Sequence, residues 1–141
     1  MLMNTEGSYK TRPGVQVMEL NAQQVRALSR NWLATVCRHN PAHVVSLYAP
    51  EGVLVGTVAQ RIKQGRADIK TYFDKFLTKP NLCGSFIGND VVQSYPMWAV
   101  HTGNYIFEWN GGEVLARYTF VYCWTREGWK IANHHSSALP E

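Results

Sequence analysis

The stretch ARYTFVYCWTREGWKIANHHSS (residues 116–137) decides the fold. It contains two runs rich in β-branched and aromatic residues on either side of Arg126-Glu127-Gly128. Such runs, interrupted by a short turn that contains glycine, are typical of two antiparallel strands joined in a hairpin. The sequence therefore predicts strands over residues 113–125 and 129–137.

The segments before this hairpin continue the same pattern. Residues 83–94 and 97–109 are also rich in strand-forming residues, and a turn signal follows each of them. Short connections of this kind join antiparallel neighbours, so the last four predicted strands form an antiparallel meander. The two turn signals are Tyr95-Pro96 and Asn110-Gly111-Gly112.

The first half of the chain carries helical signals instead. Asn21 is a favoured N-cap, and Gln24 stands at the capping-box position three residues later. A long helix is therefore predicted to begin there and to end before Pro41, which itself opens a shorter helix. A strand over residues 52–58 and a helix over residues 66–79 follow.

This order of elements predicts an α+β domain. About three helices, all placed before the four-stranded meander, are expected to pack on a strongly curved antiparallel sheet. A curved sheet would leave a cavity beneath the helices. We expect a flexible N-terminal segment over residues 1–18 and a single domain over residues 19–141.

Composition excludes several classes of protein. The 141 residues fit one domain of ordinary size, and 45% apolar with 17% charged residues is typical of a globular chain. The net charge is +4, but the basic residues are scattered, and the densest run (residues 61–70) is interrupted by glycine and aspartate. We therefore expect neither nucleic acid nor a membrane as a partner.

The three cysteines point to a reducing compartment. Cys37, Cys83 and Cys123 are far apart in sequence and odd in number, which argues against a disulfide framework. The N-terminus lacks the apolar core of a signal peptide. We therefore predict reduced thiols and a cytoplasmic protein.

Metal and cofactor motifs are missing. His134 and His135 would point to opposite faces of a strand, and no acidic residue or cysteine lies near them in sequence. Ser136 has no G-x-S-x-G context, and the chain contains neither G-x-G-x-x-G nor a P-loop. We expect no metal site, no serine nucleophile and no cofactor.

Five segments together resemble a known superfamily from about residue 20 to the end. They are similar to the nuclear transport factor 2-like (cystatin-like cone) domains. Within that superfamily they resemble the bacterial branch related to the association domain of calcium/calmodulin-dependent protein kinase II, a branch also called SgcJ/EcaC-type and similar to the SnoaL-like cyclases. The segments are NWLATV (31–36), SLYAPEGVLVGTV (46–58), TYFDKFL (71–77), ARYTFVY (116–122) and GWKIANHHSSALPE (128–141).

The resemblance implies a cone of helices closed on a curved sheet, a pocket between them, and self-association as a homodimer or a ring of dimers. It does not fix one chemistry. Our first hypothesis is a self-associating domain that holds a small apolar or amphipathic molecule. The alternatives are a cofactor-independent isomerase, cyclase or dehydratase acting on a polyketide- or steroid-like substrate, and a pure scaffold with a filled cavity.

The turn at residues 126–128 decides which face of the last two strands lines the pocket. A three-residue loop pairs Phe120 with His134, whereas a two-residue loop pairs Phe120 with His135. Glycine at the third loop position favours the first register. The predicted pocket then consists of Trp32, Tyr48, Tyr72, Phe76, Tyr118, Phe120, His134 and Ser136.

A catalytic reading needs a base in that pocket. In ketosteroid-isomerase-type chemistry the base is a carboxylate, and the resemblance places its position near Gly56, where this sequence has no acid. A histidine base, His134 or His135, is the alternative. The hydroxyl that orients a substrate carbonyl would come from Tyr48, Tyr72 or Tyr118.

The opposite face of the sheet is the predicted subunit interface. In the favoured register Ile131 and its alternate neighbours point away from the pocket, and a sheet face rich in aromatic residues is what a dimer buries. The predicted interface residues are Arg117, Asn133, His135, Trp98 and Trp109.

Overall fold

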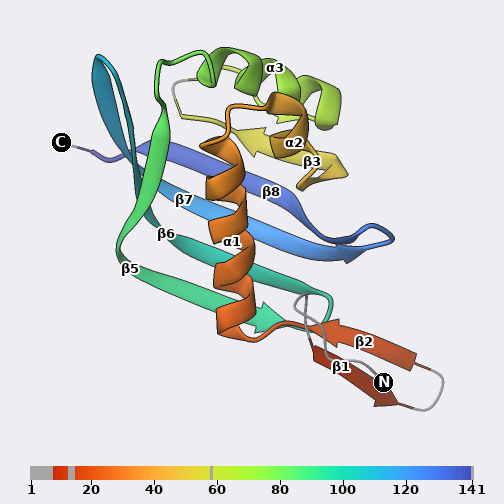
Figure 1. Cartoon of the computed structure of the whole chain (residues 1–141). Helices are drawn as coiled ribbons and strands as arrows, with labels where there is room; N and C mark the ends of the chain where they lie inside the picture. The colour runs from red at the N-terminus through yellow and green to blue at the C-terminus, as the bar shows by residue number, and fades with distance from the viewer. Residues whose placement is uncertain (1–7, 13–14, 58, 141) are drawn as a thin grey trace.

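Six strands form one curved sheet in the order β4-β3-β8-β7-β6-β5, with three helices packed on it (Figure 1). The structure is a computed structural model of the chain and describes residues 8–12, 15–57 and 59–140. The helices are α1 (Ala22–Val36), α2 (Pro41–Val45) and α3 (Arg66–Phe76). The strands of the large sheet are β3 (Tyr48–Val55), β4 (Lys63–Gln64), β5 (Cys83–Tyr95), β6 (Trp98–Trp109), β7 (Gly112–Thr125) and β8 (Gly128–Ala138).

Helix α1 begins where the capping signal predicts. The Asn21 side chain accepts a hydrogen bond from the Gln24 backbone N–H, and the Gln24 side chain accepts one from the Asn21 backbone N–H, both at 2.9 Å. These two bonds satisfy donors that a helix start otherwise leaves unpaired. The helix buries Val25, Trp32 and Val36 against the sheet, so its apolar stripe fixes how it lies across the strands.

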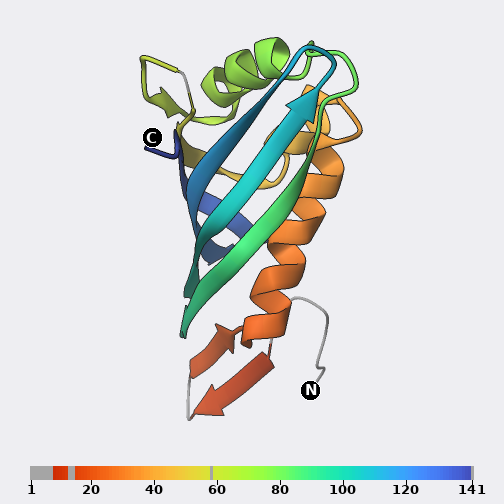
Figure 2. The same cartoon turned by 90° about the vertical axis from the view of Figure 1, so that its left-hand side faces the viewer.

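The predicted meander of β5, β6, β7 and β8 is confirmed. Consecutive strands pair antiparallel through two-residue turns at residues 96–97, 110–111 and 126–127. Gly111 has φ +111° and Gly128 has φ +97°, conformations that favour glycine. Figure 2 shows these strands twisting together beside α1.

The prediction of a purely antiparallel sheet is wrong at one strand. β3 pairs with β8 in parallel, with Leu54 opposite His134, so the sheet is mixed. Hairpin signals identify only neighbours that are consecutive in sequence. β3 and β8 are separated by most of the domain, and a connection that long imposes no antiparallel direction.

The favoured register of the last hairpin is confirmed, but a bulge contributes to it. Phe120 pairs with His134, while the turn itself is a two-residue turn that pairs Thr125 with Gly128. The register shifts by one residue at Ala132, which is the extra residue of a β-bulge. The prediction that Ile131 faces outward is therefore wrong, and Ile131 is buried opposite Tyr122. A one-residue shift moves the β8 side chains between the turn and the bulge to the opposite face of the sheet.

The prediction of reduced thiols is wrong for two of the three cysteines. Cys37, the C-cap of α1, and Cys83, the first residue of β5, form a disulfide with their Cα atoms 4.6 Å apart. The 46 residues between them concealed the pairing, because the end of α1 meets the start of β5 only in the folded chain. Cys123 keeps a free thiol.

The described part of the predicted flexible segment contains two strands that the sequence did not indicate. β1 (Ser8–Arg12) and β2 (Val15–Glu19) pair antiparallel and project from the end of the large sheet (Figures 1 and 2). Met18 is buried, and its carbonyl accepts a 2.6 Å hydrogen bond from the Met97 N–H. This bond ties β2 to the β5–β6 turn. Residues 1–7 lie outside the described residues.

No helix in the described part of the chain has the length and apolarity needed to cross a bilayer.

Candidate functional site

The side chains predicted to line a pocket do converge beneath the helices. The Trp32 ring lies 5.1 Å from those of Phe120 and His134, and the Phe120 and His134 rings stack at 4.2 Å. Tyr48 and Tyr118 are buried in the same cluster. The predicted set is therefore one packed group drawn from α1, α3, β3, β7 and β8.

That group fills the interior of the cone. The remaining cavity has a volume of about 20 Å³ and is lined by Trp32, Tyr72, Tyr105, His134 and their neighbours. A cavity of this size holds about one water molecule. This interior cavity, as the described residues line it, has no room for a steroid-sized substrate.

A continuous chain of hydrogen bonds crosses this interior. The Trp32 indole N–H donates to the Tyr48 hydroxyl at 3.2 Å, and that hydroxyl lies 2.8 Å from His134 Nδ1. His134 Nε2 lies 3.2 Å from the Tyr105 hydroxyl, which donates to Ser136 Oγ at 2.6 Å. Because the Tyr105 hydroxyl gives its proton to Ser136, His134 Nε2 carries a proton and donates it to the Tyr105 oxygen. In the neutral ring Nδ1 then accepts from the Tyr48 hydroxyl.

This arrangement makes His134 a poor general base. Both ring nitrogens are bonded to tyrosines, so neither is free to take a proton from a substrate. The side chain is 2% exposed, and burial, with a smaller contribution from neighbouring His135, lowers its pKa to about 3. His134 is therefore a neutral structural group at neutral pH.

The resemblance places a carboxylate base near Gly56, and the Tyr72 ring lies against this residue. A Cβ atom added to Gly56 would lie 2.4 Å from the Tyr72 ring, so no larger residue fits there without displacement. The Tyr72 hydroxyl donates to the Thr57 carbonyl at 3.2 Å. Gly56 thus allows Tyr72 to close the cone on this side.

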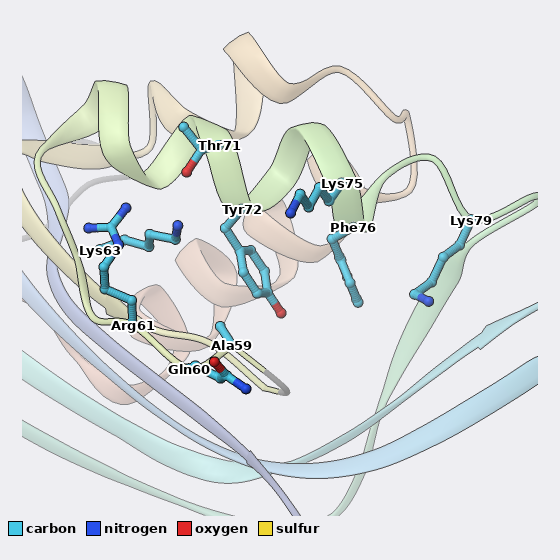
Figure 3. Close-up of a pocket in the computed structure, with 9 residues that line it drawn as sticks. All are labelled: Ala59, Gln60, Arg61, Lys63, Thr71, Tyr72, Lys75, Phe76 and Lys79. Carbon is cyan, nitrogen blue, oxygen red and sulfur yellow. The ribbon is translucent and has the colours of Figure 1, made fainter.

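A larger groove lies outside the cone, against α3 (Figure 3). Its volume is about 440 Å³, and Tyr72 and Phe76 line both this groove and the small interior cavity. The sequence predicted these two aromatic residues as pocket residues but missed the cations beside them. The missed residues are Arg61, Lys63, Lys75 and Lys79.

The sequence offered only a weak signal for those cations. The basic run at residues 61–70 is interrupted by glycine and aspartate, and Lys75 and Lys79 belong to a different part of the chain. Only the packing of α3 beside β4 brings the two groups to one groove.

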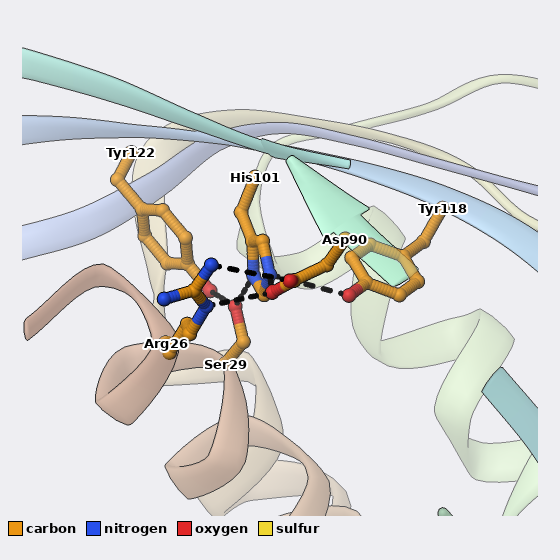
Figure 4. Close-up of polar contacts among 6 residues, drawn as sticks. All are labelled: Arg26, Ser29, Asp90, His101, Tyr118 and Tyr122. Atoms are coloured by element: carbon orange, nitrogen blue, oxygen red, sulfur yellow. Dashed lines mark hydrogen bonds and ion pairs between the residues drawn. The ribbon is translucent and has the colours of Figure 1, made fainter. Parts of the chain in front are cut away.

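A second polar cluster joins α1 to the sheet (Figure 4). His101 Nε2 lies 2.8 Å from Asp90 Oδ2, and His101 Nδ1 lies 2.7 Å from Ser29 Oγ. Arg26 donates two hydrogen bonds to Asp90, and the Tyr122 hydroxyl lies 2.7 Å from Ser29 Oγ. The order Asp–His–Ser resembles an activated nucleophile, but Ser29 is fully buried.

The charges of this cluster also favour a structural role. The Arg26 guanidinium, followed by His101, lowers the pKa of Asp90 to about 2, which makes Asp90 a weak base. Burial lowers the pKa of His101, against the opposing effect of Asp90. Sequence patterns gave no sign of the cluster, because its members come from α1, β5, β6 and β7.

Four of the five predicted interface residues lie on the outer face of the sheet. Arg117, Asn133, His135 and Trp98 are exposed there. Trp109 differs, because it alternates in step with the buried residues Tyr105 and Phe107 and so lies on the helix side of the sheet. Lys79 Nζ lies 4.4 Å from the centroid of its ring. His134 is buried and His135 is exposed, so the two side chains point to opposite faces of the sheet. The described residues include no group of three His, Cys, Asp or Glu side chains placed to hold a metal ion.

The chain is similar to several solved structures. The chain is 37% identical to a Xanthomonas campestris structure named for a calcium/calmodulin dependent protein kinase II association domain, with 99% of each chain covered and a TM-score of 0.77. An NTF2-like protein with a cystatin-like fold from Novosphingobium aromaticivorans shares 15% identity, with 83% and 80% covered and a TM-score of 0.69. A ketosteroid isomerase-like protein from Erwinia carotovora atroseptica shares 15% identity, with 83% and 95% covered and a TM-score of 0.67.

The two distant structures show the fold alone, an NTF2-like, cystatin-like cone. A search of the curated proteins finds no match. The family model described as calcium/calmodulin dependent protein kinase II association domain matches residues 21–140. On that match, the chain belongs to the calcium/calmodulin dependent protein kinase II association domain family.

Proposed function

We propose that this chain is a self-associating domain whose partner is a second copy, bound through the outer face of β5, β6, β7 and β8. The observation that carries the proposal is the row of large apolar side chains on that uncovered face. Val91 is 59% exposed and Trp98 is 42% exposed, although both belong to the sheet rather than to a loop tip. The other exposed members are Tyr95 and Leu115.

The register places these side chains on one surface. Val91 pairs with Thr102, and Tyr95 pairs with Trp98. The rings of Tyr95 and Trp98 stack with their centroids 4.4 Å apart. Half-buried Val100 and Val121 lie opposite each other on the same face. A stable interface buries roughly 800 Å² on each partner and is depleted of charge at its centre. The apolar and aromatic residues on β5 and β6 fit that requirement, and the polar Arg117, Asn133 and His135 lie on β7 and β8 of the same face.

The interior supports the same conclusion. The cone leaves about 20 Å³ among the side chains predicted to bind a ligand, and His134 has no nitrogen available to a substrate. A function carried by the surface therefore fits the geometry better than a reaction inside the cone.

The proposal is tested by the mass of the protein in solution. The double variant Val91→Glu/Trp98→Glu places charge among the exposed apolar residues of the face, and Ile62→Glu is the control, because Ile62 is 60% exposed outside this face. Size-exclusion chromatography with light scattering should give a multiple of the 16.0 kDa chain for the wild type and the control. The double variant should elute as a monomer with an unchanged circular dichroism spectrum. Dissociation of the control to the same extent would refute the assignment of the face.

The predicted cytoplasmic location rests on reduced cysteines and on the N-terminal sequence, and the first of these grounds fails. Cys37 and Cys83 form a disulfide, and disulfides persist mainly in oxidising compartments. The location is therefore not part of the proposal.

A further inference from the structure

We propose that the groove beside α3 binds an amphipathic organic anion. The apolar body of this ligand lies on the Tyr72 and Phe76 rings, and its anionic head lies beside the groove lysines. This proposal goes beyond self-association and is independent of it, because the groove lies on the helix side of the sheet, away from the outer face.

The wall of the groove is apolar and rigid. The Tyr72 and Phe76 rings stack at 5.6 Å and 22°, and Phe107 supports Phe76 edge-on at 5.3 Å. Phe73 packs behind Tyr72 at 5.1 Å. These aromatic neighbours fix the two rings before any ligand arrives, so little ordering cost opposes binding. The groove volume of about 440 Å³ lies within the usual range of about 300–1,000 Å³ for ligand pockets.

The Tyr72 hydroxyl does not supply the polar contact. It already donates to the Thr57 carbonyl, and burial raises its pKa well above the ordinary value. The ring face of Tyr72 is what the groove offers, and that surface suits an apolar body.

The charge of the side chains that line the groove indicates which head group the ligand carries. Four cationic side chains and no acidic ones line the described part of the groove. Arg61 is neutralised by Asp68 at 2.7 Å, whereas no described carboxylate forms an ion pair with Lys63, Lys75 or Lys79. In Figure 3, Lys63 lies to one side of Tyr72 and Lys79 to the other, beyond Phe76.

This excess of positive charge beside an apolar wall selects an anionic head attached to an apolar body. A carboxylate and a phosphate monoester share this chemistry. Both would meet the ammonium groups of lysines, which are point charges without the planar geometry that favours one anion.

Calorimetric titration with three ligands of equal chain length tests the proposal. Decanoate and decyl phosphate carry the anionic head, and 1-decanol carries the same body without charge. The wild type should bind at least one of the two anions several-fold more tightly than 1-decanol, and the tighter anion identifies the head group. Equal affinity for 1-decanol, or no binding of either anion at millimolar concentration, would overturn the proposal.

A matched pair of variants on α3 separates the groove from general surface charge. Lys75→Gln removes a lining cation, and Lys70→Gln makes the same change of charge outside the lining, where Lys70 pairs with Asp74. Lys75→Gln should weaken anion binding about two- to fivefold, the size expected for one exposed ion pair, and leave 1-decanol binding unchanged. An equal loss in Lys70→Gln would refute the site. Light scattering of both variants reports self-association separately.

Discussion

Replacing His134 by glutamine should remove the loss of folding stability that this histidine causes at acidic pH. His134 is buried, its nitrogens are bonded to Tyr48 and Tyr105, and burial lowers its pKa from 6.5 to about 3. The unfolded chain therefore binds a proton between these two values while the folded chain does not. Stability is fully present above pH 6.5 and falls as the pH decreases from 6.5 toward 3.

The size of the effect follows from the same two values. At pH 5 the imidazole of the unfolded chain is about 1.5 pH units below its pKa, and each unit corresponds to about 1.4 kcal/mol, which gives a loss of about 2 kcal/mol. Glutamine does not titrate, so the variant lacks this contribution. His101, whose pKa is also lowered, contributes equally to both proteins and cancels from the comparison.

Urea denaturation at pH 7 and pH 5 measures the difference. The free energy of unfolding of the wild type should fall between the two pH values by about 2 kcal/mol more than that of His134→Gln. Glutamine will also change stability at pH 7, so only the pH-dependent difference counts. Equal losses in the two proteins would show that His134 is accessible to protons in the folded state, which would revive it as a candidate base.

Two further predictions concern packing and the disulfide. Gly56→Ala should lower the free energy of unfolding by about 1–3 kcal/mol, because its Cβ would meet the Tyr72 ring at 2.4 Å; urea denaturation measures this, and a change within the error of the assay would contradict the tight contact. Titration of the denatured, unreduced protein with a thiol reagent should detect one thiol, that of Cys123, and three after reduction; three before reduction would exclude the disulfide.

Local signals in the sequence were sufficient for most of the fold. The Asn21 capping box set the start of α1, and the short turns set the four-strand meander. The pairing of Phe120 with His134 was predicted from a three-residue loop, and the two-residue turn together with the bulge at Ala132 gives the same pairing. Each of these features depends on residues close together in sequence, where propensity and turn chemistry decide the conformation.

Features that depend on distant residues could not be predicted in this way. The parallel pairing of β3 with β8 and the disulfide between Cys37 and Cys83 join segments with no local signal for each other. The bulge at Ala132 has no distinctive residue type, and it alone moved Ile131 to the buried face.

The candidate site also contains residues that local patterns predict and residues that only the tertiary fold brings together. Its aromatic members were predicted because bulky residues at helical and strand spacing must pack together. Whether they enclose a pocket or fill it depends on how closely the rings approach, and a sequence does not specify these distances. The groove cations and the cluster around His101 were missed because they converge only through the tertiary fold.

Sedimentation equilibrium of the wild-type chain over a range of concentrations tests self-association most directly. The predicted result is a mass of twice 16.0 kDa or a higher multiple, maintained down to about 1 μM, the concentration below which an interface of modest affinity dissociates. A mass of 16.0 kDa at every concentration up to about 100 μM would contradict the proposed function.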